Sequence, residues 1–324
     1  MKTLNSTAKI SPGASPNSLP TKKKSLFKRL YAQKELQLMV LFGLVFVFIF
    51  RFLPAYGLQL AFKELIPGRS IGDSPWVGLK HFQDFFSSGY AGIVFYNTFV
   101  LSFLRILFGF PLPIIFALLL NEIASKRARS LVQGISYLPH FMSWVICSSV
   151  LFTIFAGNGG TINFVLMKLG IIHQQINWFS EPKYFWPLLI ITDNWKEVGW
   201  GAIIYVAAIA GIPNDIYESA SLDGAGKLKQ ALYITIPCIM PTVVIMLVLR
   251  LGNILDAGFD QILILRNSAI GSASYILDVY VYDTGIQAAR YGYATAVGLF
   301  KSVVGFVFIW LSNSFAKKYD MGIW

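Results

Sequence analysis

The chain has 324 residues, of which 55% are hydrophobic and only 13% are charged, and its mean hydropathy is +0.59. Soluble domains have about a quarter charged residues, so this composition excludes an ordinary soluble domain and indicates an integral membrane protein. The net charge of +11 does not indicate a nucleic-acid partner, because residues 1–36 hold eight lysines and arginines against one glutamate and carry most of the excess.

The N-terminal segment, residues 1–30, is rich in Ser, Pro and Lys. Such a composition cannot bury a core, so we expect a disordered basic tail in the cytoplasm. Residues 31–324 are predicted to form one transmembrane domain. The first apolar run begins near Leu36, too far into the chain for a signal peptide, and no small-residue cleavage site follows it, so it is expected to remain as a span.

Six apolar runs are long enough to cross a bilayer, which requires about 20 residues. The sequence therefore predicts an all-α polytopic membrane protein with six transmembrane helices. Basic residues exceed acidic ones in segment 122–132 and at the C-terminus, whereas segments 63–94 and 264–290 are balanced. Because basic loops stay in the cytoplasm, both termini are predicted to be cytoplasmic. The predicted spans are 37–62, 95–121, 134–156, 184–210, 238–263 and 291–316.

The fourth and fifth predicted spans carry polar residues at intervals of three or four positions, which places them on one face of each helix. A charged side chain is costly in lipid, so these faces are expected to meet a cavity or a partner. Arg105 and Lys301, in other spans, are expected to pair internally or to snorkel. The two stripes are Asp193, Lys196, Glu197 and Trp200 in the fourth span, and Arg250, Asn253, Asp256 and Asp260 in the fifth.

Two interpretations of the stripes stay open. They can form a salt-bridge network that only holds helices together, or they can line a hydrophilic path. The candidate path residues are Asp193, Asn194, Trp195, Lys196, Glu197, Trp200, Arg250, Asn253, Asp256, Phe259 and Asp260. No catalytic residue or metal site is predicted, because the three histidines and two cysteines are scattered. No GxxxxGK[ST] phosphate loop occurs, so a process driven by ATP needs the nucleotide to bind another chain.

A polar segment separates the fourth and fifth spans, and by the topology above it lies in the cytoplasm. Asn214 or Asp215 can cap a short helix that begins near Ile216. Gly224 and Gly226 are expected to stop or bend this helix. A second short amphipathic run then leads to the next span. The sequence predicts a helix, a glycine turn and a second helix at the membrane surface.

This segment, residues 211–237, resembles the EAA motif of binding-protein-dependent ABC importer permeases. In that motif a glycine follows E-A-A after three residues, and I-x-L-P comes about nine residues later. Ser219 and Ile236 replace the usual alanine and leucine. The stretches "SPWVGLKHFQDFF" and "YATAVGLFKSVVGF" resemble the sugar-permease branch that contains LplB-type and alginate-importer permeases. The matching positions are Glu218, Ala220, Asp223, Gly224, Ala225, Ile234 and Pro237.

The resemblance implies the permease half of a type I importer in the cell inner membrane, working by alternating access. It implies a second, homologous permease, two ATPase subunits that hold ATP and Mg, and an extracytoplasmic sugar-binding protein. The expected cargo is an oligosaccharide or polysaccharide fragment, and acidic alginate- or pectin-like sugars are among the candidates. Trp195, Trp200 and Phe259 are the candidate stacking surfaces. The residues implied in ATPase coupling are Glu218, Ser219, Ala220, Asp223, Gly224, Ala225 and Pro237.

Within this resemblance, Glu218 is the charged contact to the ATPase, and Ala220 and Gly224 permit close packing in its groove. Two other classes of protein stay open on the residues alone. One is a proton-coupled secondary sugar transporter that uses Glu197, Asp256 and Asp260 as a relay. The other is an intramembrane enzyme acting on lipid-linked sugars, although no catalytic signature surrounds the acidic residues.

Overall fold

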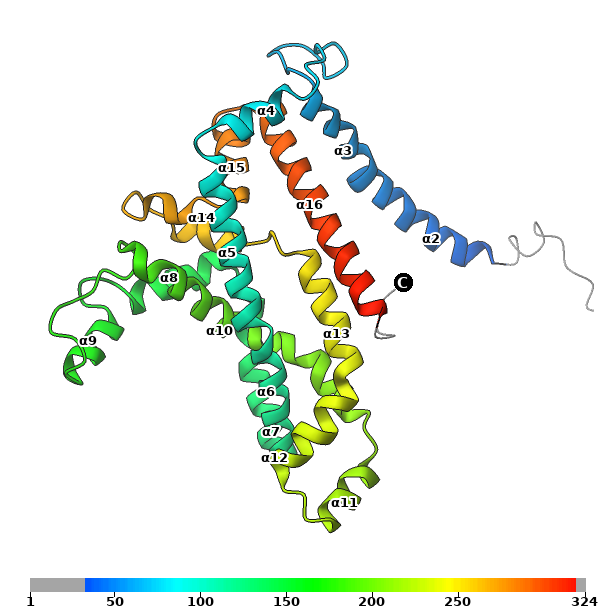
Figure 1. The fold of residues 1–324 in the computed structure, drawn as a ribbon, viewed down its shortest axis with the longest axis vertical. Coiled ribbons are helices and arrows are strands. Elements are labelled where there is room, and N and C mark those ends of the chain that lie inside the picture. Colours follow the sequence, from blue (N-terminus) through cyan, green and yellow to red (C-terminus); the bar gives the residue numbers. More distant parts are fainter. Residues whose placement is uncertain (1–32, 319–324) are drawn as a thin grey trace, which may run out of the picture. The chain divides into compact units, whose positions relative to one another are not determined.

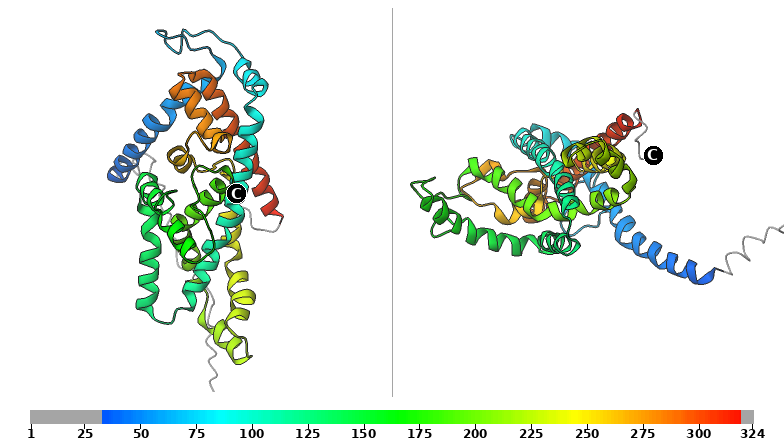
Figure 2. Two further views of the ribbon diagram at one scale, coloured as in Figure 1. Left: turned by 90° about the vertical axis from the view of Figure 1, so that its left-hand side faces the viewer. Right: turned by 90° about the horizontal axis from the view of Figure 1, so that it is seen from below.

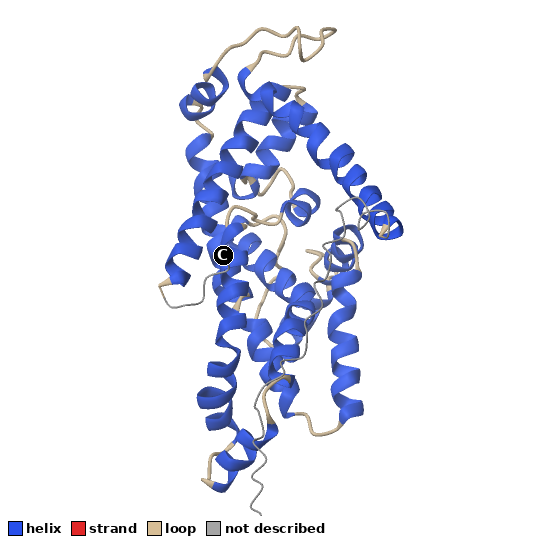
Figure 3. Ribbon diagram, turned by 90° about the vertical axis from the view of Figure 1, so that its right-hand side faces the viewer, coloured by secondary structure: helices blue, strands red, loops and turns tan. Residues whose placement is uncertain are grey.

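The computed structural model describes residues 33–318, so the tail prediction for residues 1–30 lies outside the described part of the chain. This part is helical and contains no strand, apart from one isolated bridge between Lys63 and Trp76 (Figure 3). The all-α prediction is therefore confirmed. Within these residues, four helices are long and apolar enough to cross a membrane, or up to six if each of two bent helix pairs is one span. That range includes the predicted six.

Two compact units divide the chain, residues 1–56 and residues 57–324. The described helices of the first unit are α2 Lys34–Val47, η1 Phe48–Phe52 and α3 Leu53–Ala55, followed across the boundary by η2 Tyr56–Phe62. The second unit contains α4 Lys80–Ser87, α5 Ala91–Gly109, α6 Pro111–Glu122, α7 Lys126–Tyr137, η3 Leu138–Phe141, α8 Trp144–Ile154, α9 Thr161–Lys168, α10 Pro182–Ala210, α11 Asn214–Leu222, α12 Lys227–Gln230, η4 Ala231–Thr235, α13 Ile236–Gly252, α14 Phe259–Leu265, η5 Gly271–Ser274, α15 Leu277–Tyr282, η6 Asp283–Gln287 and α16 Tyr291–Lys317.

Long helices of the second unit pack in pairs. α10 packs along α6, and α13 packs along α16 (Figure 1). α11 lies at one end of this unit, and α4 and α15 lie at the opposite end (Figure 2). The segment that resembles the EAA motif is therefore separated along the bundle from the segments between α4 and α5 and around α15.

The largest apolar core joins short helices to the middle of the bundle. It contains Leu101 of α5, Leu189 of α10 and Ile262 of α14, each fully buried. α14 has only seven residues and cannot be stable alone, because short isolated helices are marginal in water and their stability comes from packing. Burial of Ile262 against α5 and α10 therefore fixes α14 beside the polar face of α10.

The fifth predicted span, 238–263, is wrong as one continuous helix. α13 ends at Gly252, residues 253–258 are not helical, and α14 starts at Phe259. Asp256 Oδ1 accepts a hydrogen bond from the Gly258 amide at 3.2 Å, which offers the backbone an alternative to the helix. Gly258 then has φ +84°, in the left-handed region. The regular stripe predicted from Arg250 to Asp260 is consequently split between a helix, a loop and a second helix.

The third predicted span, 134–156, is also broken. The segment Lys126–Phe141, which is α7 followed by η3, and α8 form a pair bent by 103°. Pro139 lies in η3, directly before this break, and has no amide hydrogen to continue the α-helical ladder. Ser143 then caps α8 by accepting from the Ile146 amide at 3.4 Å. The sequence signals for this break were a proline and a capping serine inside an otherwise apolar run.

The segment at residues 211–237 has the predicted helix–turn–helix form, with different details. α11 begins at Asn214 after Pro213, and no side chain caps it, so the expected cap by Asn214 or Asp215 is wrong. The helix ends as predicted at Gly224, which has φ +77°. The Gly224 amide donates to the Ser221 carbonyl and the Ala225 amide to the Ala220 carbonyl, the two bonds of a Schellman ending.

Candidate functional site

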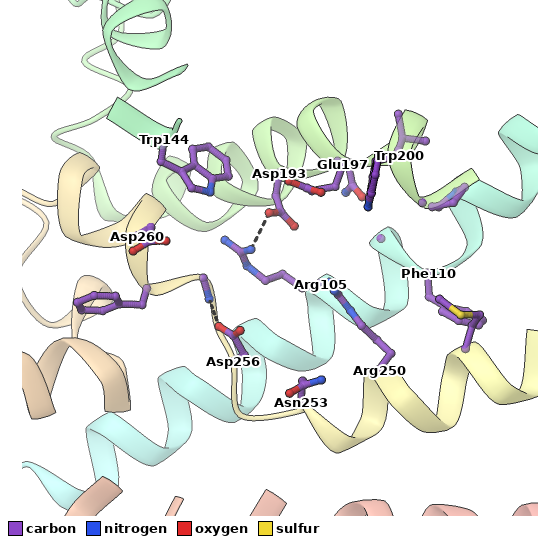
Figure 4. Close-up of a pocket in the computed structure, with 18 of the residues that line it drawn as sticks. Arg105, Phe110, Trp144, Asp193, Glu197, Trp200, Arg250, Asn253, Asp256 and Asp260 are labelled. Carbon is purple, nitrogen blue, oxygen red and sulfur yellow. Dashed lines mark hydrogen bonds and ion pairs between the residues drawn. The ribbon is translucent and has the colours of Figure 1, made fainter. Parts of the chain in front are cut away.

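A polar cavity of about 460 Å³ lies among six helices of the second unit, α5, α6, α8, α10, α13 and α14. Ligand sites in proteins typically have volumes of about 300–1,000 Å³. Figure 4 shows side chains of α5, α10 and α13 around this space, with Arg105 directed toward Asp193. The lining residues are Arg105, Gly109, Phe110, Pro113, Trp144, Asp193, Asn194, Glu197, Val198, Trp200, Gly201, Tyr205, Met246, Arg250, Asn253, Asp256, Gly258, Phe259 and Asp260.

All but two of the candidate path residues line this cavity. The residues brought together are Asp193, Asn194, Glu197, Trp200, Arg250, Asn253, Asp256, Phe259 and Asp260. Trp195 and Lys196 do not line it. Trp195 is exposed on another face of α10, and the Lys196 side chain is buried. The split of the fifth span does not separate its polar residues from α10, because Gln261 of α14 donates to the Leu189 carbonyl and to the Thr192 hydroxyl of α10.

Arg105 and Asp193 form a buried ion pair at the wall of the cavity. Arg105 Nη1 lies 2.9 Å from Asp193 Oδ1, and the two side chains are 6% and 13% exposed. Arg105 also donates to Gln261 Oε1, and Gln261 donates to the Thr192 hydroxyl at 2.7 Å. The network ties α5, α10 and α14 together. Internal pairing of Arg105 is therefore confirmed, as is that of Lys301, which lies 2.6 Å from Asp278.

Glu197 is held by two partners. Lys196 Nζ lies 3.0 Å from Glu197 Oε1 and donates to the His140 carbonyl at 2.8 Å. His140 Nδ1 lies 2.7 Å from Glu197 Oε2. The His140 ring stacks on Trp200, with centroids 4.3 Å apart and planes within 1°. Lys196 thus neutralises one carboxylate as predicted, but it does so from behind the cavity wall and not from its surface.

Three charged residues of the cavity remain outside these networks. Among residues 33–318, Arg250, Asp256 and Asp260 lie within ion-pair distance of no oppositely charged side chain. Within the same range of residues, the Asp256 side chain accepts a hydrogen bond from the Gly258 amide and from no other group. A charge in a membrane protein that lacks a protein partner usually faces water or a ligand. These three groups are therefore the ones available to a molecule in the cavity.

Several lining residues were not predicted from the sequence. Phe110, Trp144, Tyr205 and Met246 complete the apolar part of the wall. Phe110 lies between α5 and α6, and the other three come from α8, α10 and α13. Apolar side chains in apolar runs carry no signal of their own. Arg105 was recognised as an intramembrane cation, but its position on the cavity wall depends on how α5 packs against α10.

The segment at residues 211–237 presents exposed side chains at the opposite end of the unit from α4 and α15. Glu218, Ser219, Asp223 and Gly224 are exposed, whereas Ala220 and Ala225 are half-buried. Leu222 is 90% exposed at the end of α11. Pro237 lies in the first turn of α13, directly after the π-helical turn η4. Inside the turn, Gln230 donates to the Ser221 hydroxyl and to the Ala225 carbonyl, which holds α11 and α12 together.

Residues 109–321 match the family described as "Binding-protein-dependent transport system inner membrane component". The chain belongs to this family. Its members are membrane permease subunits of importers, so the family assignment also agrees with a transport function and with the segment that resembles the EAA motif.

Two proteins of Bacillus subtilis (strain 168) are similar to this permease over most of its length. "Protein LplB" is 41% identical over 287 residues, covering 89% of this chain and 90% of the relative. "Polygalacturonan/rhamnogalacturonan transport system permease protein YteP" is 40% identical over 298 residues, covering 92% of each. Both matches extend well beyond the region of the family model.

A solved chain has the same fold. It belongs to a bacterial ABC transporter involved in the import of the acidic polysaccharide alginate. The TM-score is 0.83 at 38% sequence identity, and the match covers 90% of this permease and 98% of that chain. This match shows that the chain has the fold of an ABC importer permease, and the four to six candidate spans among its described residues include the predicted six.

Proposed function

We propose that this permease forms half of the translocation path of an ATP-driven importer of acidic oligosaccharides, such as fragments of pectin or alginate. The observation that carries the proposal is the cavity between α10 and the α13–α14 connection, in a chain similar to permeases for such polymers. Its wall combines an aromatic ring with hydrogen-bonding groups, the composition expected for a sugar site.

Arg250 is the proposed contact for a uronate carboxylate. A guanidinium binds a carboxylate through two parallel hydrogen bonds, and Arg250 has no carboxylate partner within the described residues. Arg105 cannot take this role without leaving Asp193. Asp256 and Asp260 accept hydrogen bonds from sugar hydroxyls. Trp200 is the proposed stacking surface, since its ring is held in place by His140.

The proposed importer contains other protein chains besides this permease. A second, homologous permease closes the other half of the path, and two ATPase subunits hold ATP and Mg. α11 docks in a groove of one ATPase, and the segments around α4 and α9 face an extracytoplasmic sugar-binding protein. Both termini lie in the cytoplasm, as the charge distribution supports. Closure of the ATPases draws the α11 segments together and opens the path outward by alternating access.

A proton-coupled secondary transporter is the less favoured reading. Such a transporter needs a chain of acidic groups that exchange protons across the membrane. Glu197 is instead bonded to Lys196 and His140, so both of its carboxylate oxygens already have partners within the protein. The family assignment favours the ATP-driven reading, since permeases of that family serve transport systems with a binding protein.

The test is uptake by proteoliposomes that contain the complete importer and its binding protein. Oligogalacturonides and oligo-alginates are compared with uncharged xylo-oligosaccharides of matched length. We expect ATP-dependent uptake of acidic sugars, lowered roughly tenfold or more by Arg250→Ala because a charge-assisted contact is worth about 1.5–3 kcal/mol. Arg250→Lys, the matched control, retains part of the uptake. Uptake driven by a proton gradient without ATP would refute the proposal, and equal uptake of uncharged sugars would refute its acidic cargo.

A further inference from the structure

A second cavity, of about 650 Å³, lies on the other side of the α13–α14 connection. It is lined by one residue of η2, by α15 and η6, and by the first half of α16. Asp256 and Phe259 line both this cavity and the first one. The lining residues are Leu58, Asp256, Phe259, Asp278, Val281, Tyr282, Gly285, Ile286, Tyr291, Ala294, Thr295, Gly298, Leu299, Lys301 and Ser302.

The two cavities adjoin because the fifth span is interrupted. A continuous α-helix is about 10–12 Å wide with its side chains and would form a thick wall. Between Gly252 and Phe259 the chain is instead a single non-helical segment, without the width of a helix. Gly258 has no side chain, and its φ of +84° turns the chain into α14. This thin connection allows Asp256 and Phe259 to reach both spaces.

The second cavity carries the aromatic and polar groups of a sugar site. The Phe259 and Tyr282 rings lie 5.7 Å apart at an angle of 55°, so the aromatic surface continues from the shared residue into this cavity. Lys301 holds Asp278 in an ion pair at 2.6 Å. Burial raises the pKa of Asp278, and the Lys301 ammonium opposes that rise. Paired in this way, the two charges leave the second cavity without a free cation among its lining residues.

A lipid chain is the other occupant that an open, partly apolar cavity in a membrane protein suggests. Three charged groups line this one, and ionised side chains are strongly disfavoured against hydrocarbon. A saccharide can contact both the apolar and the charged side chains of the wall, because its ring faces are apolar and its hydroxyls donate and accept hydrogen bonds. Asp256, free of any cationic partner at the junction, can accept from such hydroxyls.

We propose that the second cavity is a further saccharide subsite, and that one oligosaccharide lies across the α13–α14 connection with its units in both cavities. This inference rests on the proposed function and deepens it. The sugar units nearest Arg250 are bound through their carboxylates, whereas the sugar units beyond Asp256 are bound by ring stacking and by hydrogen bonds to their hydroxyls. The second cavity then selects for chain length, because a disaccharide fills only the first.

The experiment compares uptake of a disaccharide and of a pentasaccharide of galacturonate by the reconstituted complete importer. Tyr282→Ala removes part of the aromatic surface. Thr295→Trp fills the cavity without removing a packed side chain. Phe306→Ala, on α16 outside both cavities and 68% exposed, is the matched control. We expect the first two variants to lower pentasaccharide uptake roughly tenfold while disaccharide uptake changes less than about twofold, on the scale of one aromatic contact.

The outcomes separate the two claims. Length-selective loss in both cavity variants, with Phe306→Ala unchanged, supports the second subsite. Equal loss for both saccharides, or no loss with either, overturns it and leaves the importer function standing. If the wild-type importer takes up neither acidic saccharide, the proposed function itself fails. Tyr282→Ala that does not assemble is replaced in the comparison by Thr295→Trp, whose added volume alone decides the result.

Discussion

Gly258 occupies a position where any side chain would disturb the cavity wall. Its φ of +84° is in the left-handed region, and a Cβ atom built there falls against the Arg105 guanidinium. Gly258→Ala therefore strains the backbone and pushes Arg105 away from its partners. Because Arg105 holds Asp193 and Gln261, one methyl group is expected to break the polar network that joins α5 to α10 and α14.

The expected cost follows from these two effects. A left-handed conformation costs an alanine about 1–2 kcal/mol. Separating Arg105 from Asp193 leaves buried charges without partners, which costs about 3–5 kcal/mol when both side chains are as buried as these. Together the effects amount to roughly 4–7 kcal/mol. At about 2–4 °C for each kcal/mol in a chain of this size, the apparent melting temperature should fall by roughly 10 °C or more.

The assay is the heat stability of the purified importer, followed by size-exclusion chromatography after a temperature step. Gly92→Ala is the matched control, since Gly92 lies in helix α5 with nothing within 4 Å of an added Cβ atom. Gly258→Asn tolerates the left-handed backbone but keeps the Cβ atom, so it should lose nearly as much stability as Gly258→Ala. A Gly258→Ala protein as stable as Gly92→Ala would refute the reasoning, and full rescue by Asn would refute the displacement of Arg105.

Three further variants test other parts of the permease. Gly224→Ala should increase the rate of amide hydrogen exchange in the turn after α11 about tenfold, because Gly224 has φ +77° and alanine is strained there. Gly226→Ala should leave this rate unchanged, because Gly226 has φ −67°. Equal exchange rates in the two variants would contradict the Schellman ending. Glu218→Lys should lower sugar-stimulated ATP hydrolysis by the importer, while the helices still insert in the membrane. An unchanged rate of hydrolysis would contradict the proposed contact of Glu218 with the ATPase. Trp200→Ala should reduce sugar uptake roughly tenfold, and Trp195→Ala should reduce it less than about twofold. A larger loss with Trp195→Ala than with Trp200→Ala would contradict the proposed sugar contact on the Trp200 face of α10.

The helical fold and the position of the polar groups could be predicted from composition and spacing. Apolar runs of about 20 residues require helices in lipid, since every backbone group must be bonded within the span. Charges inside those runs indicate a cavity or a partner, so the sequence alone identifies Asp193, Arg250 and Asp260 as candidates for a polar path. The glycine ending of α11 followed equally from the sequence, because the chain turns there through a conformation that suits glycine.

The breaks in the helices and the partners of the charges could not be predicted in the same way. Whether residues 253–258 stay helical depends on competition between the helix ladder and the Asp256 side chain, which differ by little free energy. Lys196 fits the spacing of a cavity face, yet its side chain turns behind the wall toward His140, a residue 56 positions away.

What the sequence determined by itself is therefore an all-α membrane permease with polar groups in two spans and an EAA-like segment between them. Periodicity fixes which residues share a face of one helix, and the EAA-like spacing fixes the family. Only the tertiary structure decided which charges are neutralised, that Arg105 pairs with Asp193, and that an interrupted span leaves two adjoining cavities. The physical reason is that pairing and cavity shape depend on distances between helices, which no local pattern along one helix contains.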